Sequence, residues 1–274
     1  EIAQTLVAAD VTRVSLGAQS FTPTELRVLD RTHRPEQVAE TIAICRQHGI
    51  QQLSIDLIFG VPGQTPASWQ KSLAAAIALE PDHISCYALT YEEGTKLFAR
   101  LHRGRIERMD DDLEADLYEL TMDFLPRAGY EQYEISNFAR PGAACRHNLV
   151  YWRNEPYLGL GPSACGYVAG TRYKNVPDLN EYLRRIESNE SVWSEHEQLD
   201  NAASARETAM LALRLSEGIN RRRFTQRYGT DPTTHFASQI ARHTSDGLLE
   251  VTDDTIRLTR PGRMLANTVA ADFL

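Results

Sequence analysis

The feature that most constrains the fold is an alternation of strand-like and helix-like segments through the first half of the chain. Apolar strands are predicted at Val11–Ala18, Gln52–Phe59 and His83–Leu89. Between them, Gln37–His48 has its apolar residues at helical spacing, and Thr65 with Pro66 begins a second helix that runs to about Leu79. Such units recur every ~30–40 residues, the length of the βα repeats that build a parallel sheet or barrel. We therefore expect an α/β fold.

After a predicted helix at Asp110–Ala128, the pattern becomes less regular. Tyr130–Phe138 alternates like a strand, and Ala139–Asn175 is rich in glycine and aromatic residues. We expect the latter to be an irregular loop region, which in a compact protein is usually functional.

The last hundred residues change character. Helices are predicted at Leu179–Glu187, Ala205–Leu215, Arg221–Tyr228 and Thr234–Ser245. A strand pair at Leu248–Val251 and Thr255–Leu258 follows, and a closing helix begins at Arg263. Helices followed by a small hairpin are typical of a winged helix. We place the domain boundary near Val176, which gives domains 1–176 and 177–274.

Composition excludes several classes of protein. The chain has 274 residues and a formal net charge of −8. No run of about 18 apolar residues is present to span a membrane. The four cysteines have no CxxC spacing, which argues against a zinc site or an iron–sulfur cluster made by this chain alone. Because the chain begins at Glu1 inside a helical pattern, we expect it to be the carboxyl-terminal part of a longer protein.

Polar residues occur where the predicted strands end, which is where ligands bind in parallel βα folds. Gln19 ends the first strand, Asp56 lies inside the second, and Thr90 follows the third. A carboxylate in an apolar strand needs a partner. Asp56 is therefore either a ligand-binding residue or a structural one that caps a backbone group or pairs with an arginine. Arg31 precedes a helix and could bind an anion, whereas His33 and Arg34 are better explained as a solvated helix entry.

The segment Cys145–Asn154, C-R-H-N-L-V-Y-W-R-N, is the most unusual in the chain. A helical turn would place His147 and Tyr151 on one face. An imidazole, the rings of Tyr151 and Trp152, and the flanking cations Arg146 and Arg153 are the parts of a haem site. The alternative is an ordinary hydrogen-bonding histidine in a loop.

Taken together, these motifs resemble the radical S-adenosylmethionine (SAM) proteins of the oxygen-independent coproporphyrinogen III oxidase group. The resemblance rests on VTRVSLGAQSF, LDRTHR, LSIDLIFGVPGQT and ISCYALTYEEGT, and it extends over essentially the whole chain. Within that group, CRHNLVYW resembles the HNxxYW signature of the HemW-type haem chaperones.

The resemblance implies a partial (β/α)6 TIM-like barrel followed by a small, mostly helical domain, with SAM, a 4Fe–4S cluster and haem as ligands. Gln19 and Arg31 would contact the methionine end of SAM, Asp56 its ribose and Thr90 its adenine. His147 would contact haem, with Asn148, Tyr151 and Trp152 completing the motif. The cluster motif CxxxCxxC and the glycine-rich SAM motif of the family are absent here and are expected upstream of Glu1.

The function implied is a cytoplasmic haem chaperone, able to act peripherally at the membrane, that delivers haem to acceptor proteins such as respiratory ones. The alternative is oxidative decarboxylation of coproporphyrinogen III, so whether the protein is an enzyme stays open. A third reading is a winged-helix nucleic-acid binder. Residues 190–274 carry 10 Lys and Arg against 12 Asp and Glu, so we expect no nucleic-acid partner.

Overall fold

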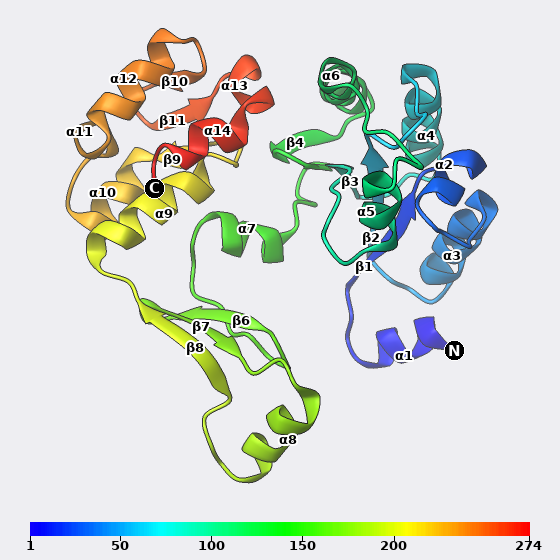
Figure 1. Cartoon of the computed structure of the whole chain (residues 1–274), viewed down its shortest axis with the longest axis horizontal. Helices are drawn as coiled ribbons and strands as arrows, with labels where there is room; N and C mark the ends of the chain where they lie inside the picture. The colour runs from blue at the N-terminus through cyan, green and yellow to red at the C-terminus, as the bar shows by residue number, and fades with distance from the viewer. The chain divides into compact units, whose positions relative to one another are not determined.

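The computed structural model describes residues 1–274, which form two compact units, Glu1–Ala144 and Cys145–Leu274. We call them the N-terminal and the C-terminal unit. Figure 1 shows both in chain order. The predicted division near Val176 concerns sequence domains and stays a prediction.

The N-terminal unit is a five-stranded sheet with helices. Its strands are β1 (Arg13–Gln19), β2 (Gln52–Phe59), β3 (His83–Ala88), β4 (Glu131–Glu134) and β5 (Asn137–Ala139). Its helices are α1 (Ile2–Ala8), α2 (Pro23–Val28), α3 (Pro35–Gln47), α4 (Pro66–Ala78), α5 (Lys96–His102) and α6 (Asp111–Arg127). The strand order is β1-β2-β3-β5-β4, with β1, β2 and β3 parallel and β5 antiparallel to both β3 and β4. The sheet is open, as expected for part of a barrel.

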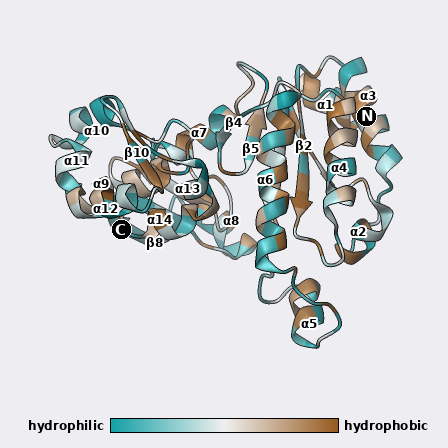
Figure 2. Cartoon of the chain, turned by 90° about the horizontal axis from the view of Figure 1, so that it is seen from above, coloured by the Kyte–Doolittle hydropathy of each residue, from teal (hydrophilic) through white to brown (hydrophobic).

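One face of this sheet forms the core of the unit. Helices α3, α4 and α6 pack against β1 and β2 (Figure 2). Ile55, Leu57 and Ile84 are fully buried beneath them, and the Trp69 indole of α4 donates a 2.9 Å hydrogen bond to Thr121 of α6. Burial of this apolar surface is the main stabilising contribution in the unit. It also leaves the opposite face of the strands to polar residues, because side chains alternate along a strand.

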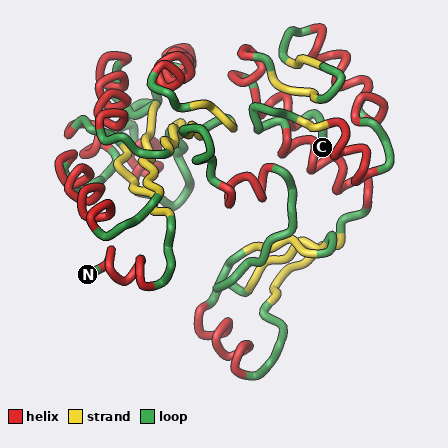
Figure 3. The backbone as a smooth tube through the Cα atoms, turned by 180° about the vertical axis from the view of Figure 1, so that it is seen from behind, coloured by secondary structure: helices red, strands yellow, loops and turns green.

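The C-terminal unit begins with α7 (Arg146–Trp152) and an antiparallel sheet. That sheet comprises β6 (Cys165–Val168), β7 (Thr171–Asn175) and β8 (Trp193–Gln198), and α8 (Leu179–Glu187) lies beyond one of its ends (Figure 3). The expectation that Ala139–Asn175 is an irregular loop region is confirmed only in part, because α7, β6 and β7 lie within it and loops connect them. Two glycines of this stretch allow close packing, since a Cβ on Gly166 would lie 2.2 Å from the Tyr173 ring and one on Gly159 would lie 2.3 Å from the Cys165 carbonyl oxygen.

The rest of the C-terminal unit is mostly helical. Its helices are α9 (Asn201–Ala212), α10 (Arg221–Tyr228), α11 (Pro232–His235), α12 (Ala237–Ser245), α13 (Arg260–Met264) and α14 (Ala266–Ala271). A small sheet has the order β10 (Leu249–Val251), β11 (Thr255–Leu258), β9 (Ile219–Asn220). The predicted hairpin is confirmed as β10–β11, and β9 adds a third strand that the sequence pattern did not indicate.

Two predicted elements are each divided in the structure. The single strand predicted at Tyr130–Phe138 is a hairpin, β4–β5, which reverses at Ile135 and Ser136. The helix predicted at Thr234–Ser245 breaks at Phe236, whose ring is buried against Phe224 and Phe273.

Candidate functional site

The polar face of the N-terminal sheet centres on Asp56. The strand register places Gly17, Asp56 and Ser85 side by side on β1, β2 and β3. The Asp56 carboxylate accepts one hydrogen bond from the Ser15 hydroxyl and one from the Ser85 hydroxyl, each 2.7 Å long. Its partners are thus hydroxyls of the two neighbouring strands. Neither a backbone group nor an arginine, the structural partners considered from the sequence, takes that place.

Gln19 lies on the same face, at the carboxyl end of β1. Its φ of +62° follows an irregularity in the β1–β2 register between Gly17 and Gln19. The side chain folds back over β1, and a Cβ on Gly17 would lie 2.6 Å from the Gln19 amide nitrogen. Gly17 therefore makes room for the Gln19 amide on the face that carries Asp56.

Arg31 and Thr90 lie in two loops, and side chains of α5 connect the segment after Thr90 with the segment before Arg31. His33 Nε2 lies 3.1 Å from the Ala18 carbonyl oxygen, which fixes the Arg31 loop at the end of β1 and gives His33 a structural role. From α5, beyond Thr90, Lys96 pairs with Asp30 at 2.9 Å and Arg100 donates to the Val28 carbonyl at 2.8 Å. These contacts leave both Arg31 and Thr90 exposed at the carboxyl end of the sheet.

Two buried polar clusters lie beside this face, and the sequence reading missed both. His83 Nδ1 lies 2.8 Å from the Ser54 hydroxyl, and its Nε2 lies 3.0 Å from the Tyr133 hydroxyl. Burial, with the positive charge of Arg13, lowers the pKa of His83 to about 3, so the ring is neutral at pH 7.

The second cluster surrounds Glu25 of α2. This buried carboxyl accepts hydrogen bonds from Ser20 and Ser68 at 2.6 Å each and from the Gln64 amide at 3.0 Å. It joins α2 to the start of α4 and has no open side for a ligand. In the sequence, Glu25 shows no motif with Ser20 or Ser68, so nothing there distinguishes it from other glutamates.

In the C-terminal unit, α7 presents His147 to solvent. The predicted helical turn is confirmed, with Tyr151 Oη 2.9 Å from His147 Nε2 and the two rings edge to face at 4.8 Å. Tyr151 in turn packs edge to face on Tyr157 at 4.6 Å. Asn148 is half-buried on the same helix, and Arg146 is exposed beside His147.

The end of α7 is anchored to α9 and α10. Asn154 is buried with φ of +49°, and its amide donates to the Thr208 hydroxyl at 3.0 Å. Arg227 donates to the Asn154 carbonyl at 2.9 Å, and the Arg214 guanidinium lies 4.8 Å from the centre of the Trp152 ring. Arg153 pairs with Glu217 at 3.1 Å. Trp152 and Arg153 are therefore committed to contacts within this unit.

The residues present do not fit an iron–sulfur cluster. Cys45 and Cys86 are buried in α3 and β3, whereas Cys145 and Cys165 lie in the other unit. No group of three or more His, Cys, Asp or Glu side chains is placed to hold a metal ion. No helix is long and apolar enough to span a membrane.

Two protein-family models match parts of this chain. The radical SAM superfamily model matches residues 1–76, which include Gln19, Arg31 and Asp56. The model of the HemN C-terminal domain matches residues 199–265, which run from the start of α9 to the end of α13.

Curated relatives match the whole chain. "Heme chaperone HemW" of Bacillus subtilis is 34% identical over 269 residues, which cover 98% of this chain and 71% of the relative. The protein of the same name from Mycobacterium tuberculosis is 38% identical over 274 residues, which cover 100% and 68%. The chain thus spans about two thirds of the length of these relatives.

The solved structure of coproporphyrinogen III oxidase (HemN) from Escherichia coli has the same fold. It superposes with a TM-score of 0.81 at 23% identity, over 99% of this chain and 66% of that one. By sequence over its whole length, the chain belongs to the HemW haem chaperone family of the radical SAM superfamily.

Proposed function

We propose that this chain is part of a haem chaperone that holds haem at α7 and delivers it to acceptor proteins. The observation that carries the proposal is the exposed His147, whose ring is oriented by Tyr151 through a 2.9 Å hydrogen bond. A histidine that binds iron is commonly oriented by a hydrogen bond at its other ring nitrogen. The names of the relatives support haem as the cargo.

The Tyr151 contact suggests which nitrogen would bind iron. If His147 Nε2–H donates to the Tyr151 oxygen, Nδ1 keeps its lone pair and becomes the iron ligand. The edge-to-face pair of Tyr151 and Tyr157 would offer haem an aromatic surface, and Arg146 would offer a cation for a propionate. Because Trp152 lies against Arg214, we propose that it serves the haem site by anchoring α7, and that Asn148 completes the helix surface.

We further propose that SAM binds on the polar face of the N-terminal sheet. Asp56 would accept from the ribose hydroxyls, Gln19 and Arg31 would bind the methionine end, and Thr90 would lie near the adenine. The residues fit such a ligand, since Asp56, held by two hydroxyls, and the folded-back Gln19 amide share one face. Bound SAM supplies radical chemistry in this superfamily only together with a 4Fe–4S cluster, which the four cysteines of this chain do not fit.

Haem is thus the proposed cargo, and respiratory haem proteins are the proposed acceptors. We propose a cytoplasmic location, with contact to the membrane through membrane-associated acceptors. The fold of HemN supports an alternative, the oxidation of coproporphyrinogen III. Anaerobic incubation of the full-length protein with coproporphyrinogen III, SAM and a reductant decides it, because product formation would favour that alternative.

The test is a haem titration of the full-length protein followed by its absorption spectrum. His147→Ala is expected to weaken haem binding at least about tenfold and to shift the Soret band, because the iron loses its ligand. Tyr151→Phe keeps the imidazole and should have a smaller effect. The matched control is His102→Ala on α5, another exposed helical histidine. Unchanged affinity and spectrum in His147→Ala would exclude His147 as the ligand.

A further inference from the structure

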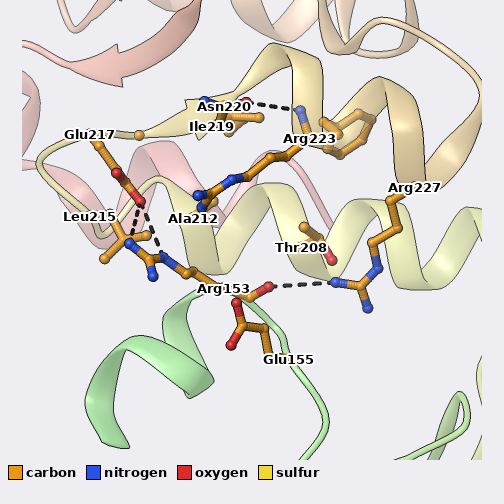
Figure 4. Close-up of a pocket in the computed structure, with 12 residues that line it drawn as sticks. Arg153, Glu155, Thr208, Ala212, Leu215, Glu217, Ile219, Asn220, Arg223 and Arg227 are labelled. Atoms are coloured by element: carbon orange, nitrogen blue, oxygen red, sulfur yellow. Dashed lines mark hydrogen bonds and ion pairs between the residues drawn. The ribbon is translucent and has the colours of Figure 1, made fainter. Parts of the chain in front are cut away.

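A small cavity lies between α9, β9 and α10 in the C-terminal unit (Figure 4). Its volume is about 160 Å³. Ala212, Leu215, Ile219 and Phe224 form its apolar walls. An apolar cavity of about this size can hold a benzene ring. The cavity therefore fits one aromatic ring or one branched aliphatic group.

Arginines surround this cavity, and they differ in their partners. Arg153 is paired with Glu217, through Nε at 3.3 Å and Nη2 at 3.1 Å. Arg227 donates to the Asn154 carbonyl oxygen at 2.9 Å. Arg223, in contrast, extends from α10 across the cavity toward Ala212, and its guanidinium has no hydrogen-bond or ion-pair partner (Figure 4). The apolar cavity therefore lies beside the guanidinium group of Arg223, which makes no hydrogen bond or ion pair within the protein.

The charges favour a single negative group. The lining contains three arginines and two glutamates, Glu155 and Glu217, and Glu217 is already paired with Arg153. The remaining charges of the lining are the positive charges of Arg223 and Arg227 and the negative charge of Glu155, which leaves one net positive charge. A guanidinium presents parallel N–H donors that match the two oxygens of a carboxylate, and this geometry is shorter and stronger than a neutral hydrogen bond.

We propose that this cavity binds an amphipathic carboxylate, with the apolar group between α9 and α10 and the carboxylate on Arg223. The C-terminal residue of a polypeptide, when it is apolar, has this chemistry, and so does a small free organic acid. This site is separate from His147, and the proposal does not rest on haem binding. It assigns a ligand to the HemN-type C-terminal domain itself.

The test uses calorimetric titration of the full-length protein. Phenylacetate and the peptide acetyl-Gly-Gly-Phe with a free C-terminus are the probes, and phenylacetamide and the C-terminally amidated peptide are their matched controls. We expect each acid to bind at least tenfold more tightly than its amide, a difference of about 1.4 kcal/mol. If the peptide binds more tightly than phenylacetate, the ligand is a polypeptide C-terminus. If phenylacetate binds as tightly as the peptide or more tightly, the ligand is a free acid.

Arg223→Gln should weaken the acids about tenfold and leave the weak binding of the amides unchanged. This residue is exposed, so the variant should fold, which its thermal unfolding will show. Ala212→Leu, which fills the cavity, should abolish binding of all four probes. The proposal is overturned if acids and amides bind equally, if Arg223→Gln binds the acids as the parent does, or if no acid binds at about 10 mM.

Discussion

The two candidate sites, the polar face of the N-terminal sheet and helix α7 of the C-terminal unit, are held in place in different ways. Asp56 lies in the middle of a parallel sheet and receives hydroxyl groups from both neighbouring strands. Helix α7 has only seven residues and no side-chain N-cap, and its position depends on contacts made just beyond its carboxyl end. A helix this short has little stability of its own.

Each site is therefore sensitive to a different kind of substitution. On the sheet, strand register and the buried apolar face fix the side chains, so one substitution changes chemistry more readily than position. On α7, a few contacts of Asn154, Trp152 and Arg153 fix the helix, so one substitution there can displace His147 without touching it. Four experiments test this contrast.

The largest expected effect is the loss of stability of the N-terminal unit at acidic pH. The pKa of His83 in the folded state is about 3, below its ordinary value of 6.5. Between these two pH values, His83 is protonated in the unfolded chain and neutral in the folded one. His83 therefore contributes stability that is present above pH 6.5 and is lost as the pH falls toward 3. Between pH 7 and 4.5 the loss is about 3 kcal/mol.

His83→Asn should remove most of this pH dependence from the N-terminal unit. Urea titrations read by peptide-resolved hydrogen exchange would measure it. If the parent and the variant lose stability equally between pH 7 and 4.5, His83 is not the group responsible.

The second effect tests the anchor of α7. Asn154→Ala removes the hydrogen bond to Thr208 and places a Cβ-bearing residue without a polar side chain at φ +49°. We expect the C-terminal unit to lose about 2 kcal/mol, with weaker haem binding as α7 loosens. Asn154→Gly keeps the backbone conformation and should cost less. Urea denaturation measures the free energy of unfolding of both variants. If Asn154→Ala is as stable as Asn154→Gly, the positive φ at this position does not contribute to the loss.

The third effect separates chemistry from position on the sheet. Asp56→Asn keeps the shape and one hydroxyl contact but removes the charge, so the fold should persist while SAM affinity falls about tenfold, or about 1.4 kcal/mol. Equilibrium dialysis of SAM with the full-length protein measures this. Ser85→Ala is the control, because it removes one structural partner of Asp56 and leaves its charge. Undiminished SAM binding by Asp56→Asn would remove Asp56 from the site.

The smallest effect concerns the Arg153–Glu217 pair. Both side chains are partly exposed, at 32% and 50%, so the pair is expected to contribute less than about 1 kcal/mol. Glu217→Gln should lower the stability of the C-terminal unit slightly at low salt and not at all in 1 M salt. A loss well above 1 kcal/mol would show that this ion pair is a principal anchor of α7.

Local signals were enough to predict several elements. The apolar run of β2 gave its bounds of Gln52–Phe59, and Thr65 caps α4 as expected, accepting a hydrogen bond from the Ser68 amide. Helix α10 has its predicted bounds of Arg221–Tyr228, and α6 lies within the predicted range Asp110–Ala128, with Asp110 as its N-cap. In contrast, all six residues of β8 are exposed, so Trp193–Gln198 carries no apolar pattern that could have indicated a strand.

The α/β pattern follows from the spacing of apolar residues along the chain, and the sequence motifs carry the family resemblance and the residue types of both candidate sites. Which residues meet at each site depends on the tertiary structure: Ser15 and Ser85 hydrogen-bond to Asp56, and the Arg214 guanidinium lies against the Trp152 ring. The tertiary structure also decided that Arg223 is left without a partner beside an apolar cavity. The reason is physical: these contacts join residues far apart in the chain, and their partners are fixed by strand register and helix packing that no local pattern encodes.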